Sequence, residues 1–275
     1  MRILFFGDVV GRSGREGLER HIPLLRERLR PDVIVVNAEN AAGGRGITAK
    51  LAENFYAMGA VCLTTGNHVW AQREVIGTID RDPRLLRPLN YPEGTPGHGN
   101  YLHILPDGRK ILVANVMARL FVEPVLDDPF DVTEKLLAQH RLGHTAHAIL
   151  IDFHGEATSE KGAFGYVFDG RVSAVVGTHT HIPTADERIL PGGTAFQSDA
   201  GMCGDYDSVI GVKKELSIWR FVRKMPGERM MPAEGEATVC GAFIVTDDAT
   251  GLARSVDRIQ VGGKLRECLP EIRSI

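Results

Sequence analysis

The sequence predicts a mixed α/β fold, and three observations carry this prediction. The first 80 residues alternate apolar runs with amphipathic segments, which is typical of parallel strands joined by helices. Two turn sequences further along the chain, rich in Gly and Pro, indicate hairpins. The last apolar runs, residues 239–246 and 254–260, indicate an antiparallel pair. The chain is therefore expected to begin as parallel α/β and to become mixed.

The composition is that of a globular protein. Of 275 residues, 43% are hydrophobic and 24% are charged, which excludes disordered and fibrous classes. No internal repeat, low-complexity tract or Ser/Gly linker divides the chain, so we expect a single domain over residues 1–275. The net charge of −3 offers no broad positive surface for duplex nucleic acid.

The sequence also bears on location. The apolar start, residues 1–6, is shorter than the roughly 7–15 apolar residues of a signal peptide. No segment approaches the roughly 18 apolar residues of a membrane-spanning helix. The four cysteines are widely spaced without a C-x-x-C pair, which argues against a thiolate zinc site and for reduced thiols. We expect a cytoplasmic protein without a membrane partner.

The first third of the chain predicts three strands and three helices in alternation. Leu18, Ile22, Leu25 and Leu29 recur at three- and four-residue spacing, the period of an amphipathic helix. Thr48 is expected to cap the second helix. In chain order we expect a strand at 2–6, a helix at 15–29, a strand at 32–37, a helix at 48–58, a strand at 60–65 and a shorter helix at 72–80.

The remainder predicts hairpins, further helices and isolated apolar strands. Pro106-Asp107-Gly108-Arg109 and Pro191-Gly192-Gly193 have the composition of tight turns. Residues 224–236 are polar and are expected to form a loop. We expect hairpin strands at 101–105 and 110–116 and at 188–190 and 194–197, single strands at 148–153 and 171–176, and helices at 131–142 and 159–166.

Metal-binding and acid/base side chains follow five of the expected strands. In α/β sheets, ligands bind beyond the carboxyl ends of strands. Each residue alone has a structural explanation, such as a turn former or a hydrogen-bonded histidine. Their coincidence at five strand ends favours one shared site. The residues are Asp8, Glu39, Asn40, Asn67, His68, His154, His179 and His181.

This set has the chemistry of a divalent metal centre. Without His68, it offers two carboxylates, two carboxamides and three imidazoles, more than the four to six ligands that one metal needs. Seven ligands with a bridging carboxylate suit two ions about 3.5–4 Å apart. Imidazole with carboxylate and without thiolate favours Fe, Mn or Zn, and Mg is less natural.

The order of these motifs resembles the calcineurin-like metallophosphoesterase superfamily, and more closely its YmdB-like bacterial phosphodiesterases. The resemblance extends to about Gly211. Val10 stands where most of the superfamily has His, and Glu39 where most have Asp; both are typical of the subfamily. Asp205 stands before Tyr206 where Pro is expected. The motifs are Gly7-Asp8, Asn37-Ala38-Glu39-Asn40, Gly66-Asn67-His68, Asp152-Phe153-His154, Gly177-Thr178-His179-Thr180-His181 and Ser198-Asp199-Ala200-Gly201-Met202.

The resemblance implies a sandwich of two mixed β-sheets flanked by helices, with two divalent ions per chain. It implies that Glu39 bridges the ions, that His68 is the general acid, and that a metal-bridged hydroxide attacks phosphorus. The implied ligands of one ion are Asp8, Glu39, Asn40 and His181, and those of the other are Glu39, Asn67, His154 and His179.

The implied substrates are small cyclic nucleotides, 2′,3′-cyclic or 3′,5′-cyclic AMP among them. Two divalent cations, two carboxylates and a hydroxide leave a site charge of about +1, which matches one phosphodiester. Arg45 lies in the Gly-rich segment 42–47 and is expected either to contact substrate or to be an ordinary surface residue.

Other functions remain open at this point. A metal-dependent phosphomonoesterase would use the same residues. The His179-x-His181 pair is also typical of zinc amidohydrolases, although there it follows the first strand of a (β/α)₈ barrel. A third alternative is a metal- or nucleotide-binding regulatory module without turnover. A homo-oligomer is compatible with each.

Overall fold

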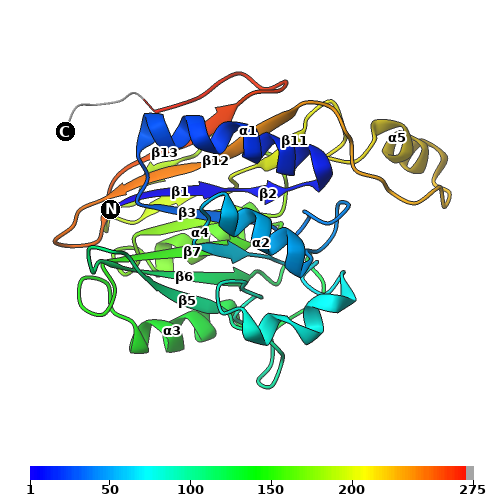
Figure 1. The fold of residues 1–275 in the computed structure, drawn as a ribbon. Coiled ribbons are helices and arrows are strands. Elements are labelled where there is room, and N and C mark those ends of the chain that lie inside the picture. Colours follow the sequence, from blue (N-terminus) through cyan, green and yellow to red (C-terminus); the bar gives the residue numbers. More distant parts are fainter. Residues whose placement is uncertain (271–275) are drawn as a thin grey trace.

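Two mixed β-sheets pack face to face and carry helices on their outer faces (Figure 1). The structure is a computed structural model that describes residues 1–270. The first sheet contains β1 (Arg2–Phe6), β2 (Asp8–Val9), β3 (Val33–Asn37), β4 (Cys62–Thr64), β11 (Met202–Asp205), β12 (Ala237–Thr246) and β13 (Ala253–Val261). The second contains β5 (Asn100–Ile104), β6 (Lys110–Met117), β7 (Ala148–His154), β8 (Ala174–Thr178), β9 (Arg188–Ile189) and β10 (Ala195–Gln197).

Strand pairing confirms the expected change from parallel to mixed. The first sheet has the order β2-β11-β12-β1-β3-β4, with β13 also paired to β12. β1 runs parallel to β3 and antiparallel to β12. In the pair of β1 and β12, Arg2 lies opposite Val245. The second sheet has the order β5-β6-β7-β8-β10-β9, parallel in the middle and antiparallel at both ends. Both expected hairpins and the late antiparallel pair are confirmed.

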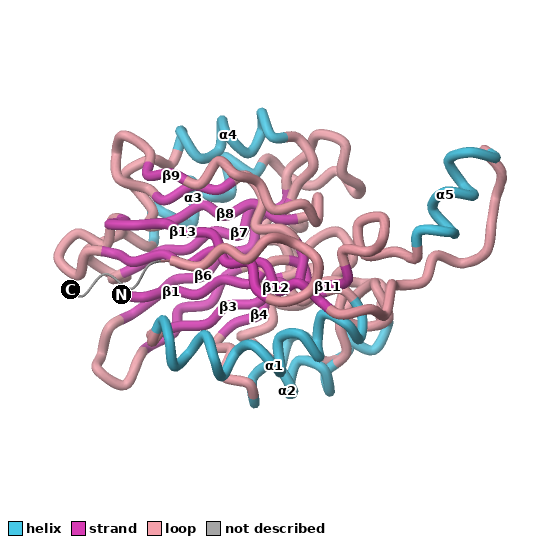
Figure 2. Tube along the Cα trace, turned by 90° about the horizontal axis from the view of Figure 1, so that it is seen from above, coloured by secondary structure: helices cyan, strands magenta, loops and turns pink. Residues whose placement is uncertain are grey.

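The alternation of side chains along β1 divides the core into layers. Successive residues of a strand face opposite sides. Ile3 and Phe5 pack between the two sheets, whereas Leu4 and Phe6 pack toward the outer helices. Helices α1 (Gly11–Leu29) and α2 (Ala49–Ala57) cover the first sheet, and α3 (Pro129–Gln139) and α4 (Thr158–Val167) cover the second (Figure 2). As expected, Thr48 caps α2 by accepting a hydrogen bond from the Leu51 amide at 3.2 Å.

The first helix starts four residues before the predicted start, because its first turn packs through glycines. A Cβ on Gly14 would lie 2.1 Å from the carbonyl oxygen of Cys203 in β11. Only glycine allows this close approach of helix and strand. Apolar periodicity does not register such positions, so the prediction began at residue 15.

Two other local predictions are wrong, and three elements were not predicted. Residues 72–80 do not form one helix; they form two short 3₁₀ helices, Arg73–Gly77 and Ile79–Arg81, separated by Thr78, whose hydroxyl bonds back to the Glu74 carbonyl at 3.2 Å. β8 begins three residues later than predicted, since Arg171 lies in the turn that ends α4. The elements that were not predicted are helix α5 (Lys214–Arg223) and strands β2 and β11.

The sandwich excludes the (β/α)₈ barrel of the amidohydrolase alternative. His179 and His181 follow β8, and the first strand leads into Asp8. Across residues 1–270, no helix combines the length and apolar character needed to cross a membrane. The four cysteines are free.

A buried ion pair anchors the loop that follows β8. Lys161 on α4 and Asp199 are each 1% exposed, and the ammonium donates to Asp199 Oδ2 at 2.9 Å and to the Thr178 carbonyl at 2.8 Å. Breaking such a pair leaves one buried charge without its partner.

Replacing Lys161→Met should therefore lower the free energy of unfolding by about 3–5 kcal/mol, measured by chemical denaturation. The matched control is Arg12→Met, which removes the exposed Arg12–Glu16 pair and should cost less than about 1 kcal/mol. Equal losses in the two variants would contradict the structural role of the buried pair.

Candidate metal centre

The polar side chains expected at strand ends meet at one edge of the sandwich, and both sheets contribute. β2 carries Asp8, and the turns after β3 and β4 carry Glu39 and Asn67. β7 ends in His154, and the loop after β8 carries His179. Because these strands end at the same edge, residues more than 170 positions apart become neighbours, as in the 3.0 Å hydrogen bond from the His179 amide to Asp8 Oδ2.

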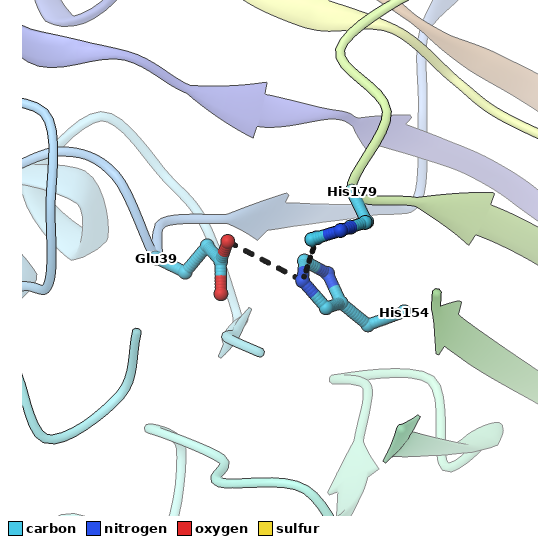
Figure 3. Close-up of side chains that lie close together, drawn as sticks. All are labelled: Glu39, His154 and His179. Carbon is cyan, nitrogen blue, oxygen red and sulfur yellow. Dashed lines mark hydrogen bonds and ion pairs between the residues drawn. The ribbon is translucent and has the colours of Figure 1, made fainter. Parts of the chain in front are cut away.

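One group of side chains surrounds Nε2 of His154. This nitrogen lies 3.3 Å from Glu39 Oε1, 3.0 Å from Asn67 Oδ1 and 3.1 Å from His179 Nδ1. Figure 3 shows the glutamate and the two imidazoles pointing toward one another. One donor atom each from Glu39, His154 and His179 lies within 4.8 Å of the others, a spacing that suits a metal ion.

A second group lies beside the first and shares Glu39 with it. Asn40 Nδ2 lies 3.1 Å from His181 Nε2, and Asp8 Oδ1 lies 3.9 Å from the same nitrogen. Glu39 Oε1 is 3.2 Å from Asn40 Nδ2, in addition to its contact with His154. All seven residues expected to bind metal are therefore brought together, with the Glu39 carboxylate between two clusters.

The interior of this site fits a cation. Asp8 Oδ1 is buried without a hydrogen-bond partner among the described residues. Burial of a carboxylate oxygen without a partner costs free energy, and coordination to a divalent metal would offset this cost. Gly66 leaves room for one: a Cβ there would lie 2.3 Å from both Glu39 Oε2 and His154 Nε2.

The protonation states of the metal-free site point the same way. Burial raises the pKa of Asp8 to about 6. Burial alone would lower the pKa of His154, but the charges of Glu39 and Asp8 outweigh it and raise the pKa to about 9. Burial and the charge of His154 lower the pKa of His179 to about 3, so this imidazole is neutral. A cation would displace the proton on His154 and find a free lone pair on His179.

Residues that the sequence interpretation left without a role orient His154. Thr178 Oγ1 donates to Asp152 Oδ1 at 2.6 Å and lies 2.9 Å from His154 Nδ1. Thr178 Oγ1 thus accepts a hydrogen bond from the Nδ1–H of His154, which leaves Nε2 facing the cluster. Asn37 Nδ2 donates to Asp152 Oδ2 at 2.8 Å. The sequence feature that could have revealed this role is Asp152, an aspartate inside an otherwise apolar strand.

The loop of His179 and His181 is held in an unusual backbone conformation. Their φ angles are 99° and 67°, in the left-handed region that non-glycine residues rarely adopt. The Tyr206 hydroxyl supports the loop by donating to the His181 carbonyl at 2.9 Å. Asp205, found where Pro was expected, accepts hydrogen bonds from the amides of Asp207 and Gly235, each at 2.8 Å.

His68 lies at the rim of the site rather than within either cluster. Its side chain is 23% exposed, and Nδ1 lies 3.9 Å from Glu39 Oε1 without a hydrogen-bond partner among the described residues. Burial lowers the pKa of His68, and the positive charge of Arg45 adds to this effect. Arg45 is exposed on its Gly-rich loop, which Gln72 fastens by donating to the Arg45 carbonyl at 2.9 Å.

Comparison with known proteins identifies the family. The family model described as YmdB-like protein matches residues 4–259. The chain belongs to the YmdB-like family. A Bacillus subtilis relative of this YmdB-like chain is named 2′,3′-cyclic-nucleotide 2′-phosphodiesterase and is 46% identical, over 95% of the chain and 97% of the relative. A Mycoplasma genitalium relative, named provisionally as a phosphatase/phosphodiesterase, is 36% identical over 88% of the chain and 84% of its own length.

Solved structures of similar proteins have the same fold. A hypothetical protein from Thermus thermophilus superposes on the YmdB-like chain with a TM-score of 0.88 and 37% identity, covering 96% of this chain and all of its own. A Mycoplasma pneumoniae protein described as a novel phosphatase also gives a TM-score of 0.88, at 32% identity, covering 95% of this chain and 93% of its own. The two-sheet sandwich is thus confirmed as a phosphatase-type fold.

The space at Gly66 gives a direct test of the site. Gly66→Ala should displace Glu39 or His154 and weaken Mn²⁺ binding at least about tenfold, the cost of disturbing ligand orientation. Affinity is measured by competition with a coloured chelator, and circular dichroism checks the fold. Gly77→Ala is the matched control, since a Cβ there meets nothing within 4 Å. Equal affinity in both variants would show that no metal occupies the space at Gly66.

Proposed function

We propose that this YmdB-like protein is a metal-dependent phosphodiesterase that hydrolyses 2′,3′-cyclic nucleotides. The observation that carries the proposal is the pair of adjacent ligand clusters with Glu39 between them. The name of the Bacillus subtilis relative supports the class of substrate. A phosphomonoesterase is the second candidate, favoured by the names of the Mycoplasma proteins.

Two divalent ions, most naturally Fe or Mn, complete the proposed site, with Zn or Mg as alternatives. The two clusters support this number, since each combines one carboxamide with imidazole and reaches the shared Glu39. Bound divalent metals supply an activated water and neutralise phosphate charge. The proposed ligands are Asp8, Asn40 and His181 for one ion, Asn67, His154 and His179 for the other, and Glu39 for both.

His68 is proposed as the general acid. When water attacks phosphorus, a P–O bond of the cyclic diester breaks and the leaving ribose oxygen needs a proton. His68 lies at the rim and outside both clusters, so its imidazole is free to donate that proton. The pKa of His68 is lowered by burial in the free protein, and the negative charge of a bound phosphodiester raises it again.

Arg45 is proposed to contact the substrate. Its positive charge lowers the pKa of His68, as the charge of His154 does, and no ion pair among residues 1–270 engages Arg45. Gly43, Gly44 and Gly46 have positive φ angles and shape the loop that carries Arg45. An arginine side chain can bind a phosphate group or stack on a nucleotide base.

The proposed reaction is tested by comparing substrates side by side. With Mn²⁺, the protein should hydrolyse 2′,3′-cyclic AMP faster than 3′,5′-cyclic AMP and faster than a phosphomonoester, and chelator should abolish turnover. Turnover of the monoester alone would assign a phosphatase. Absence of turnover with two ions bound per chain would favour the binding module.

The roles of the two kinds of histidine are separable by mutation. His68→Ala should lose about 10²–10⁴-fold in turnover, the usual contribution of a general acid, and keep its metals. His179→Ala, or Asn67→Ala, should lose metal and turnover together. Steady-state rates and elemental analysis of each variant measure the difference. Full activity of His68→Ala on a substrate with a poor leaving group would contradict the general-acid role.

A further inference from the structure

The segment that includes and follows β11 contacts His181 on two sides. On the backbone side, the Tyr206 hydroxyl and the Met202 amide both donate to the His181 carbonyl, at 2.9 Å and 3.2 Å. On the ring side, Nδ1 of His181 lies 2.8 Å from the carbonyl oxygen of Ile210. A carbonyl only accepts hydrogen bonds, so the ring nitrogen carries the proton in this contact. Nε2 of the same ring is thereby left facing the ligand cluster around Asn40.

The Ile210 carbonyl is aimed by a strained backbone. The φ angle of Ile210 is 48°, in the left-handed region, where a β-branched residue is a rare exception because its Cβ crowds the backbone. Packing does not account for this conformation, since Ile210 is 50% exposed. Among the described residues, its one hydrogen bond is the one to His181. Strained residues of this kind persist where surrounding structure fixes them, and they cluster at functional sites.

The turn around Ile210 is closed by hydrogen bonds on both sides. Ser208 Oγ accepts from the Gly211 amide at 2.8 Å and itself donates to the last carbonyl of β11 at 2.6 Å. Val209 and Val212 exchange backbone hydrogen bonds of 2.9 Å and 3.0 Å across the turn. These bonds fix the backbone before and after Ile210 and so keep its carbonyl directed at the imidazole.

We propose that the turn at residues 208–212 positions the metal ligand His181, with Ile210 acting through its backbone carbonyl. The inference rests on the proposed function, in which His181 binds one of the two ions. An acceptor on the outer nitrogen orients a histidine ligand and raises its basicity, and its loss costs about 10–100-fold in metal affinity. Thr178 has this role for His154 through its hydroxyl. At Ile210 the acceptor is main chain, so the residue type gives no sign of it.

Two substitutions at Ile210 separate its backbone from its side chain. Glycine adopts a positive φ without strain, whereas proline fixes φ at about −65° and turns the carbonyl away. Ile210→Pro should therefore weaken Mn²⁺ binding at least about tenfold, and Ile210→Gly should bind within about threefold of wild type. Affinity is measured by competition with a coloured chelator, and circular dichroism checks the fold. Wild-type affinity in Ile210→Pro, or an equal loss in both variants, would overturn the proposal.

A second pair of variants tests the turn without a change at Ile210, in case the proline variant does not fold. Ser208→Ala removes both hydrogen bonds of the hydroxyl, and Ser208→Thr retains a hydroxyl at this position. Ser208→Ala should weaken Mn²⁺ binding at least about tenfold, and Ser208→Thr should restore most of the affinity. An alanine variant that binds Mn²⁺ like wild type would show that the turn does not position the ligand.

Hydrogen exchange at His181 tests the turn without metal or substrate. In metal-free protein with ¹⁵N-labelled histidine, the Nδ1–H of His181 should exchange with water at least about tenfold faster in Ile210→Pro than in wild type or Ile210→Gly, because its acceptor is lost. His181→Ala assigns the signal. Equal exchange in all three proteins would overturn the proposal. A protein that follows this pattern but binds no Mn²⁺ would overturn the proposed function, and not the hold of the turn on His181.

Discussion

The carboxylate of Asp152 is the constraint on which the geometry of the site depends. It is fully buried, yet it accepts hydrogen bonds from Asn37 and Thr64 of the first sheet and from Thr178 of the second. A buried carboxylate is tolerated only with such partners. Burial raises the pKa of Asp152, and the positive charge of His154 and these hydrogen bonds oppose the rise. The two sheets are thereby joined directly beneath the ligands that each contributes.

This arrangement explains how seven proposed ligands from distant parts of the chain are brought together. Each proposed metal cluster combines residues from both sheets, so the separation of the sheets sets the distances within it. Thr178 forms hydrogen bonds with both Asp152 and His154 and so fixes the position of His154. The ion pair of Lys161 and Asp199 anchors the loop that follows β8. The proposed catalytic proton donor, His68, is partly exposed and lies beside the Glu39 carboxylate, outside both clusters.

Most strands, and the polar residues that follow them, were predictable because apolar runs are a strong signal of strands and ligands bind at strand ends. The short strands β2 and β11 were not. The glycines that allow α1 to pack closely against β11 were not predictable, since apolar periodicity does not show where two backbones approach closely. Helix α5 was missed because its apolar residues face solvent, not a core. Asp152 belongs to the Asp152-Phe153-His154 motif, but its role depends on hydrogen bonds between the two sheets. No local sequence pattern reveals which sheets will face each other.

The pairing of β1 with β12 has a consequence for biosynthesis. β1 is translated before β12, so one of its edges finds its partner only when residues 237–246 have been made. β2 likewise waits for β11. Until β12 emerges, the nascent protein presents an open strand edge beside an unfinished apolar layer, a species prone to aggregation. The enzyme thus closes its first sheet only after β12 has been translated, and chains that terminate before β12 would depend on chaperones or proteases.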